Sequence, residues 1–472
     1  MNFVTLEFAA FFVVFLVLNM TIRRTSPCYP GFLILANFLF YSCMGVAGAV
    51  LLLGVALAAH GAALFIGRRR GKVGDLAAVT IFILLCIGLL IFFKYFQFLV
   101  LVTSDLLAFM GSPLSLLPLL NYEAAYIAGL SFFLFQAMSY VIDLYRGTIK
   151  HPYTFLETLA YVSFFPTLLS GPILRAGQFV PQMYEQSIDE TAMQDGFLLI
   201  LGGLFKKVVL SSYLSEYVVK GVFNAPDTYA SIAVWVGVYG YALQIFCDFS
   251  GYTDLAMGVG RLMGYDIPEN FRSPYLSKNV QDFWRRWHIT LSAWLRDYLY
   301  IPLGGNRRGN VYFNIFLTMV LGGLWHGANF TFMAWGALHG IGLVVHRAFR
   351  KHFPKTTGMF APQWGVLAWM LTFHYVAFLW IFFRAENMDI AFAIFRRMFE
   401  FASVGEGFPV FAVPVITAGM ALQIWGSSLH DACLRSLVAI PCYVRGVLIG
   451  VVGACIMSMG PDGVLPFIYF GF

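Results

Sequence analysis

The stretch Leu317–Gly340 reads LTMVLGGLWHGANFTFMAWGALHG. It lies within a run of 38 residues, 309–346, that contains no Asp, Glu, Lys or Arg. A membrane-spanning helix needs about 20 consecutive apolar residues, so the run is long enough for two crossings. His326 lies inside it, and an ionisable side chain within the membrane is costly unless it has a function. His326 is therefore the first candidate functional residue.

The composition of the whole chain agrees with this interpretation. Of its 472 residues, 60% are hydrophobic and 11% are charged, whereas soluble domains carry about 25% charged residues. An ordinary soluble enzyme, a disordered protein and a nucleic-acid-binding protein are therefore excluded. The seven cysteines are scattered without a CxxC spacing, so neither a zinc site nor a disulfide framework is expected.

Continuous apolar runs predict an all-α polytopic membrane protein of about 11–13 membrane segments, because helices satisfy their own backbone in lipid. A β-barrel would show short alternating segments instead. We expect one membrane domain, residues 1–472, and interpret Gln182–Asp195 as a loop. The expected spans lie within these ranges: 8–22, 25–67 (two crossings), 76–93, 124–142, 158–174, 228–247, 309–346, 363–383, 407–423 and 439–457.

Basic residues predict the orientation, because cytoplasmic loops are enriched in Lys and Arg. Arg23 and Arg24 follow the first span, and a basic cluster at 68–72 follows the third. Both are cytoplasmic only if the N-terminus is outside. A further basic block, 347–355, then places the C-terminus outside as well. Three arginines count against this placement, because they too would lie outside: Arg384, Arg396 and Arg397.

Residues 271–310 break the apolar pattern. They read FRSPYLSKNVQDFWRRWHITLSAWLRDYLYIPLGGNRRGN, with seven basic residues against two acidic ones. One interpretation is an interfacial amphipathic helix with Trp anchors and Arg at the lipid phosphates. The other is a site for an anionic headgroup or a phosphate-bearing cofactor. On a continuous helix, His288 shares the apolar face with Trp284, Trp287, Leu291 and Leu295.

Side chains around these two histidines suggest a site. A neutral His326 suits general-base chemistry, although a helix-packing histidine bonded to a carbonyl is the alternative. We expect Gly322, Gly323 and Gly327 to leave room for a substrate. Upstream, Asp248 and Asp254 stand at the end of an apolar run. They are candidates to pair with arginines of 271–310 or to bind a cation, and their spacing matches no metal motif closely.

Three motifs resemble the membrane-bound O-acyltransferase family. They are CDFSGYTDLAMG at 247–258, ENFRSPYLSKNVQDFWRRWHITLSAWLRDYLYIPLGGNRRG at 269–309 and LGGLWHGANFTFMAWGALHG at 321–340. The strongest similarity covers about residues 240–345, and SFFPTLLSGPILRAGQF at 163–179 extends it. Within the family the chain resembles bacterial membrane subunits that O-acetylate alginate or peptidoglycan, and those that D-alanylate teichoic acid.

The resemblance implies a function and a site. Helices would surround a central funnel and tunnel, with His326 as the catalytic histidine and His288 as the second one. Acetyl-CoA would be the donor at the cytoplasmic face of a bacterial inner membrane, with no metal or bound cofactor. The acetyl group would leave on the far side for an SGNH-type partner that modifies a polysaccharide. Expected substrate contacts are Trp325, Asn329 and, for the phosphates of CoA, Arg285, Arg286, Arg307 and Arg308.

The end of the sequence, LPFIYFGF, offers a further candidate. The family resemblance implies that Tyr469 carries the acetyl group as a phenyl ester, whose leaving group, with a pKa of about 10, is better than an alkoxide. The alternative is an interfacial anchor. For the whole protein, the alternative is a transporter or flippase without covalent chemistry, but the inverted repeats of many transporters are absent from the sequence. Alginate-like polysaccharide and peptidoglycan both remain possible acceptors.

Overall fold

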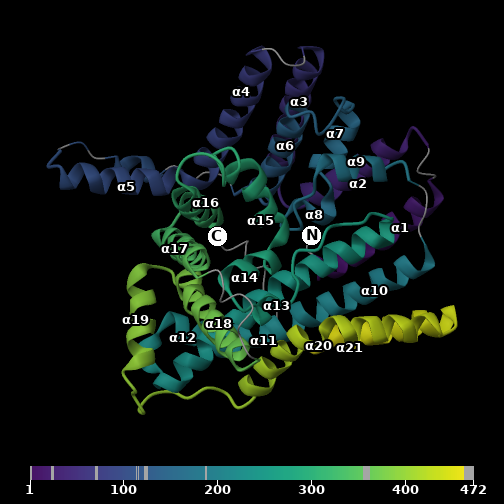
Figure 1. Cartoon of the computed structure of the whole chain (residues 1–472). Coiled ribbons are helices and arrows are strands. Elements are labelled where there is room, and N and C mark those ends of the chain that lie inside the picture. Colours follow the sequence, from purple (N-terminus) through teal and green to yellow (C-terminus); the bar gives the residue numbers. More distant parts are fainter. Residues whose placement is uncertain are drawn as a thin grey trace. The chain divides into compact units, whose positions relative to one another are not determined.

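The computed structural model describes residues 3–22, 26–69, 73–112, 114, 116–121, 126–185, 189–353 and 362–461. Within these ranges the chain is helical and contains no β-strand, which confirms the predicted all-α class (Figure 1). Tyr469 lies outside the described residues. The chain forms two compact units, residues 1–187 with 263–265, and residues 188–262 with 266–472. That all 472 residues act as one domain stays a prediction.

The first unit has a core of phenylalanine rings. Phe8, Phe15 and Phe40 all pack against Phe165, and the Asn37 side chain hydrogen-bonds the segment that precedes this ring. The predicted span 158–174 is wrong, because Pro166 and Gly171 interrupt it and only short helices form. The helices are α1 (Leu6–Thr21), α2 (Tyr29–Ser42), α3 (Val46–Arg69), α4 (Val73–Leu90), α5 (Phe96–Phe109), α6 (Leu130–Tyr145), α7 (Phe155–Val162), α8 (Phe165–Leu168) and α9 (Ala176–Gln182).

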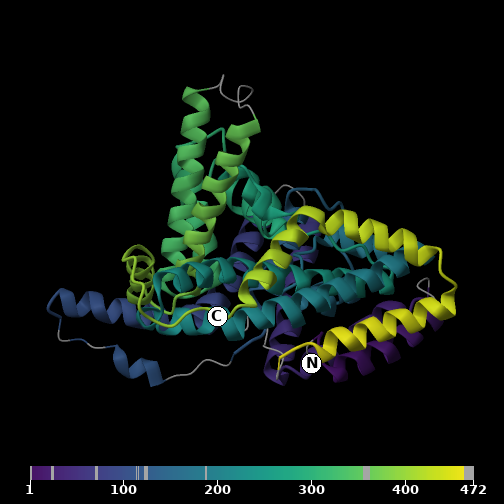
Figure 2. The same cartoon turned by 90° about the horizontal axis from the view of Figure 1, so that it is seen from below.

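The second unit carries the motifs at 247–340. Its helices are α10 (Glu190–Leu204), α11 (Ser212–Leu214), α12 (Lys220–Asn224), α13 (Ser231–Met263), α14 (Val280–Arg286), α15 (Ile289–Leu295), α16 (Val311–His326), α17 (Phe330–His352), α18 (Pro362–Arg384), α19 (Met388–Phe399), α20 (Ala412–Val438) and α21 (Cys442–Ser458). Figure 2 shows α20 and α21 as a yellow hairpin. Part of the predicted loop at 182–195 is wrong, because α10 begins at Glu190.

Helices α10 and α13 approach each other closely at two pairs of glycines. A Cβ added at Gly203 would overlap the carbonyl oxygen of Gly251, and one added at Gly196 would press on that of Gly258. The seven-residue spacing on both helices puts the two pairs on one seam. Small residues are the usual way for membrane helices to gain backbone contact without a hydrophobic driving force.

Buried charges add to the packing of the second unit. Lys207 Nζ lies 2.6 Å from Asp248 Oδ1, with both side chains almost completely buried, and Lys206 pairs with Asp254 at 2.5 Å. These carboxylates therefore form ion pairs with lysines of the segment that follows α10, where the sequence had offered arginines of 271–310. A third carboxylate, that of Asp195 on α10, contacts two groups from other helices: Arg261 and His430.

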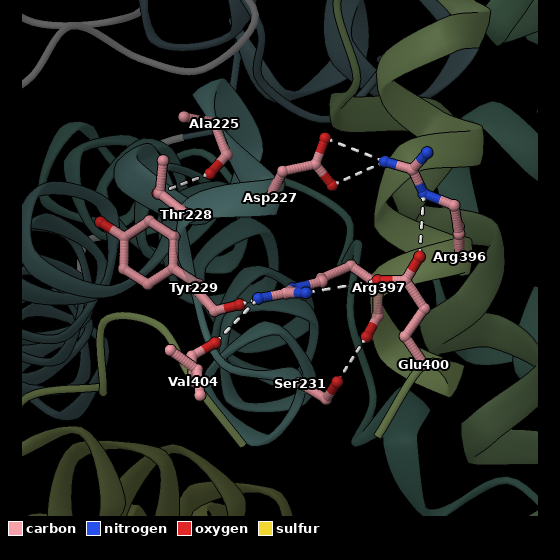
Figure 3. A network of polar contacts seen from close by, with 9 residues as sticks. All are labelled: Ala225, Asp227, Thr228, Tyr229, Ser231, Arg396, Arg397, Glu400 and Val404. Atoms are coloured by element: carbon pink, nitrogen blue, oxygen red, sulfur yellow. Dashed lines mark hydrogen bonds and ion pairs between the residues drawn. The ribbon is translucent and has the colours of Figure 1, made fainter. Parts of the chain in front are cut away.

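A surface network joins the start of α13 to α19 (Figure 3). The Arg396 guanidinium lies 2.8 Å from Asp227. Arg397 donates to the carbonyls of Tyr229 and Val404. Because both arginines have partners within the protein, their charge is a poor indicator of membrane orientation. The predicted orientation stays a prediction, since much of its evidence lies outside the described residues.

Six helical segments of the described chain are long and apolar enough to cross a membrane, and further apolar helices are shorter. The chain is therefore a multi-pass membrane protein. The long segments are Val46–Gly67, Gly74–Phe109, Glu190–Asn224, Ser231–Met263, Trp364–Arg384 and Ala412–Val438.

Candidate active site

The hairpin of α16 and α17 positions His326. Asn310 caps the start of α16 by accepting hydrogen bonds from two backbone N–H groups, and the helix ends at His326, before extended Gly327. The two helices lie side by side (Figure 1). They touch through backbone, because a Cβ added at Gly323 would overlap the Phe332 carbonyl oxygen and one at Gly336 would overlap the Met319 carbonyl oxygen.

The glycines around His326 thus have a structural role. Space beside Gly323 is filled by α17, space beside Gly327 by the Phe332 ring, and space beside Gly322 is bounded by Leu295. The expectation that they leave room for a substrate is wrong at Gly323 and Gly327. What they allow is close packing of the turn that carries His326.

Aromatic rings enclose His326, which is 3% exposed. Its imidazole centroid lies 5.0 Å from the rings of Trp325 and Phe383 and 5.2 Å from that of Trp335. The contacts with Trp335 and Phe383 are edge-to-face, a favoured geometry for aromatic pairs. Trp325, Trp335 and Phe383 lie on α16, α17 and α18, so three helices fix the imidazole ring of His326.

His288 lies at a break between two short helices. The prediction of one continuous helix through Trp284 and Leu295 is wrong, because α14 ends at Arg286 and α15 begins at Ile289. His288 itself has φ +44°, in the left-handed region that non-glycine residues seldom adopt. The ring is nevertheless fully buried, 4.7 Å from the ring of Phe249.

Asn270 determines which nitrogen of His288 carries the proton. Its side-chain oxygen accepts a hydrogen bond from the backbone N–H of Thr290, which can only donate. The atom facing His288 Nδ1 at 3.2 Å is therefore an oxygen, and Nδ1 must be the protonated nitrogen. Nε2 then carries a lone pair and has no hydrogen-bond partner in the described part of the chain. Burial lowers the pKa of His288 to about 3, so the ring stays neutral at physiological pH.

Trp325 connects the two histidines. Its ring centroid lies 5.0 Å from that of His326 and 6.2 Å from that of His288. Two imidazoles on separate segments thus contact one indole, and all three side chains are buried. The structure thus brings together three residues named from the sequence, and their roles in catalysis and substrate binding stay predictions.

The predicted phosphate-binding arginines form two groups. Arg285 and Arg286 end α14, beside His288, and Arg286 pairs with Asp282 at 3.1 Å. Arg307 and Arg308 are exposed in the turn before α16. The 16 residues of α16 separate this turn from His326, a rise of about 24 Å. Of the two groups, Arg285 and Arg286 are therefore the ones close in sequence to a histidine of the site, His288.

Asn329 already has partners within the protein. Its side-chain oxygen accepts from Thr331 N, capping α17, and its amide donates to the Glu386 carbonyl. Substrate contact by Asn329 stays a prediction. Sequence reasoning missed Asn270, Trp335 and Phe383. Trp335 and Asn270 both stand in motifs quoted from the sequence, at 317–340 and 269–309, and were visible signals, whereas Phe383 comes from a segment that only folding brings close.

Comparison with known proteins identifies the family. Residues 89–388 match the sequence model of the membrane-bound O-acyltransferase family. The chain belongs to this family. It is 39% identical over 376 residues to a probable alginate O-acetylase of Pseudomonas putida, covering 78% of this chain and 74% of the relative. It is 34% identical to a peptidoglycan O-acetyltransferase of Helicobacter pylori, covering 79% and 74%.

A more distant relative is a teichoic acid D-alanyltransferase of Bacillus subtilis, 31% identical over 53% of this chain and 66% of the relative. The family and these relatives are named for the transfer of acyl groups, so this protein is an acyltransferase. No cluster of His, Cys, Asp and Glu suited to a metal ion occurs among the described residues.

Proposed function

We propose that this membrane-bound O-acyltransferase moves acetyl groups from acetyl-CoA towards a cell-envelope polysaccharide. The observation that carries the proposal is the buried site in which His326 and His288 contact Trp325. Similarity to enzymes named for alginate and peptidoglycan acetylation supports the acetyl group and the class of acceptor.

In this proposal the proton moves through His326. The acceptor hydroxyl gives its proton to the neutral imidazole of His326 while the hydroxyl oxygen attacks the acetyl carbonyl. The tetrahedral intermediate then collapses, the carbon–sulfur bond breaks, and the imidazolium returns the proton to the departing thiolate. Nε2 of His288, held as an acceptor by Asn270, takes a hydrogen bond from a second donor of the bound substrates, such as an amide N–H of the pantetheine arm of CoA, and so orients the thioester.

The negative oxygen of the intermediate requires a donor. Trp335 is 1% exposed, its ring contacts His326, and its Nε1 has no hydrogen-bond partner in the described part of the chain. A buried N–H that is already oriented stabilises developing charge without reorganisation. We therefore assign the Trp335 indole N–H to the oxyanion.

CoA carries its phosphates and its thiol at opposite ends of a long flexible arm. Arg285 or the exposed pair Arg307 and Arg308 would bind the phosphates, since guanidinium groups suit phosphate geometry. The acetyl group would leave on the extracytoplasmic face to an SGNH-type transferase. Tyr469 would carry it as a phenyl ester.

Inside-out membrane vesicles test the proposal. Supplied outside with acetyl-CoA labelled in the acetyl group, they should release free CoA outside and accumulate label inside. Intact acetyl-CoA inside the vesicles would support a transporter instead. Label transfer only from enclosed acetyl-CoA would reverse the assigned direction.

The Tyr469→Phe variant tests the carrier step alone. It removes one oxygen and preserves the apolar ring, so an anchor would keep about its original strength. A carrier should lose polymer acetylation while expression is unchanged. Normal acetylation by this variant would leave Tyr469 as an anchor.

A further inference from the structure

Four hydrogen bonds connect one residue, Asn270, to three consecutive residues of the turn at His288. Its side-chain oxygen accepts from His288 Nδ1 at 3.2 Å, from Thr290 N at 3.0 Å and from Thr290 Oγ1 at 2.8 Å. Its backbone carbonyl accepts from Ile289 N at 3.0 Å. Asn270 is 0% exposed, so no water competes for these bonds.

The neighbouring backbone extends the same contact. Phe271 and Trp287 form an antiparallel bridge, and Arg272 N donates to the carbonyl of Arg286. The segment at 270–272 thus runs alongside the segment that joins α14 to α15. A non-glycine residue at φ +44° persists only where its surroundings determine it. Here those surroundings are the bonds to Asn270.

We infer that Asn270 is the positioning residue of the acyl-transfer site, holding His288 in one tautomer and one orientation with Nε2 directed as an acceptor. A hydrogen bond to one ring nitrogen sets which imidazole nitrogen is left available as an acceptor. The inference rests on the proposed function, in which Nε2 of His288 accepts a hydrogen bond from a donor of the bound substrates. It adds a residue that never touches the substrate and acts through His288.

The other groups around His288 do not supply this control. Phe249 and Trp325 contact the ring but neither is charged. Trp325 also contacts His326, which is the titratable group that these ring contacts bring close to His288. A carboxylate placed at position 270 would therefore be the charge in direct contact with the imidazole.

Three variants in the full-length chain, assayed in inside-out vesicles with acetyl-CoA, test the inference. Asn270→Leu should lower kcat about 10-fold or more with little change in KM, because the tautomer is no longer fixed. Asn270→Asp keeps the acceptor and adds a charge that favours imidazolium. It should keep kcat at alkaline pH within about threefold, because the acceptor and therefore the tautomer of His288 are kept.

Thr290→Val is the matched control. It removes one donor to the same oxygen and leaves the bond to His288, so both kcat and KM should match the unaltered protein. An Asn270→Asp kcat as low as that of Asn270→Leu would overturn the inference. So would a Thr290→Val loss as large as that of Asn270→Leu, because Asn270 would then only stabilise the turn.

The proposed function fails in a different experiment. If His288→Ala transfers acetyl normally, His288 has no part in the reaction and the premise is lost. If His288→Ala is impaired while the Asn270 variants behave as the unaltered protein, the function stands and the positioning role alone is wrong.

Discussion

The two histidines of the site are held by different physical means. His326 ends a regular helix and is fixed by aromatic rings from three helices. His288 sits in a left-handed turn and is fixed by hydrogen bonds to Asn270. Ring packing fixes where an imidazole lies, whereas a hydrogen bond also fixes where its proton lies. In the proposed function the two histidines have separate duties, proton transfer for His326 and orientation for His288.

The largest expected effect comes from removing the histidine in the aromatic cluster. His326→Ala should lower acetyl transfer by about 10²-fold or more, because a positioned general base contributes about 10²–10⁴-fold. Transfer of labelled acetyl in vesicles measures it. The control is His352→Ala, at the exposed end of α17, where the ring bonds the Ala348 carbonyl. Near-normal transfer by well-expressed His326→Ala would contradict the assignment.

The next effect concerns the indole that faces His326. Trp335→Phe removes the N–H and preserves an aromatic ring, so it should lower kcat about 10–100-fold while KM changes little. Trp380 is equally buried and contacts Trp335 rather than His326. Trp380→Phe should therefore change kcat less than about threefold. Equal losses in the two variants would show that packing, not the oxyanion, is affected.

A smaller effect tests the packing beneath His326. Gly323→Ala would force α16 away from the Phe332 carbonyl, and overpacking of this kind costs about 1–3 kcal/mol. Thermal unfolding in detergent should show a lower midpoint, with reduced transfer. A Cβ at Gly450 on α21 meets nothing within 4 Å, so Gly450→Ala should leave both unchanged. An unaltered midpoint for Gly323→Ala would mean that the hairpin is looser than described.

The smallest effect lies in the network of Figure 3, distant in sequence from both histidines. Arg396 and Asp227 are both more than half exposed, and such a pair contributes about 0–1 kcal/mol. Arg397 is largely buried and bonds two carbonyls. Arg397→Gln should therefore lower the unfolding midpoint more than Arg396→Gln, with near-normal transfer per folded molecule in both. The reverse order would contradict this ranking.

The sequence was sufficient for the all-α class and for the burial of His326, because long uncharged runs predict membrane helices and His326 lies inside one of them. It was misleading at His288, where helical spacing of apolar residues continues across a break. That break depends on Asn270, 18 residues earlier, and pairing between segments leaves no local pattern. At 158–174, the apolar composition predicted a membrane span, although Pro166 and Gly171 were signals in the sequence that a long helix would be interrupted there.

The central claim is that His326 and His288 serve one reaction in one site. A double-mutant cycle of His326→Ala and His288→Ala, measured as single-turnover transfer from labelled acetyl-CoA in vesicles, tests it most directly. Groups that act as a unit give losses that do not multiply, so the double variant should be about as slow as the slower single variant. Losses that multiply fully, or normal transfer by either single variant, would contradict the account.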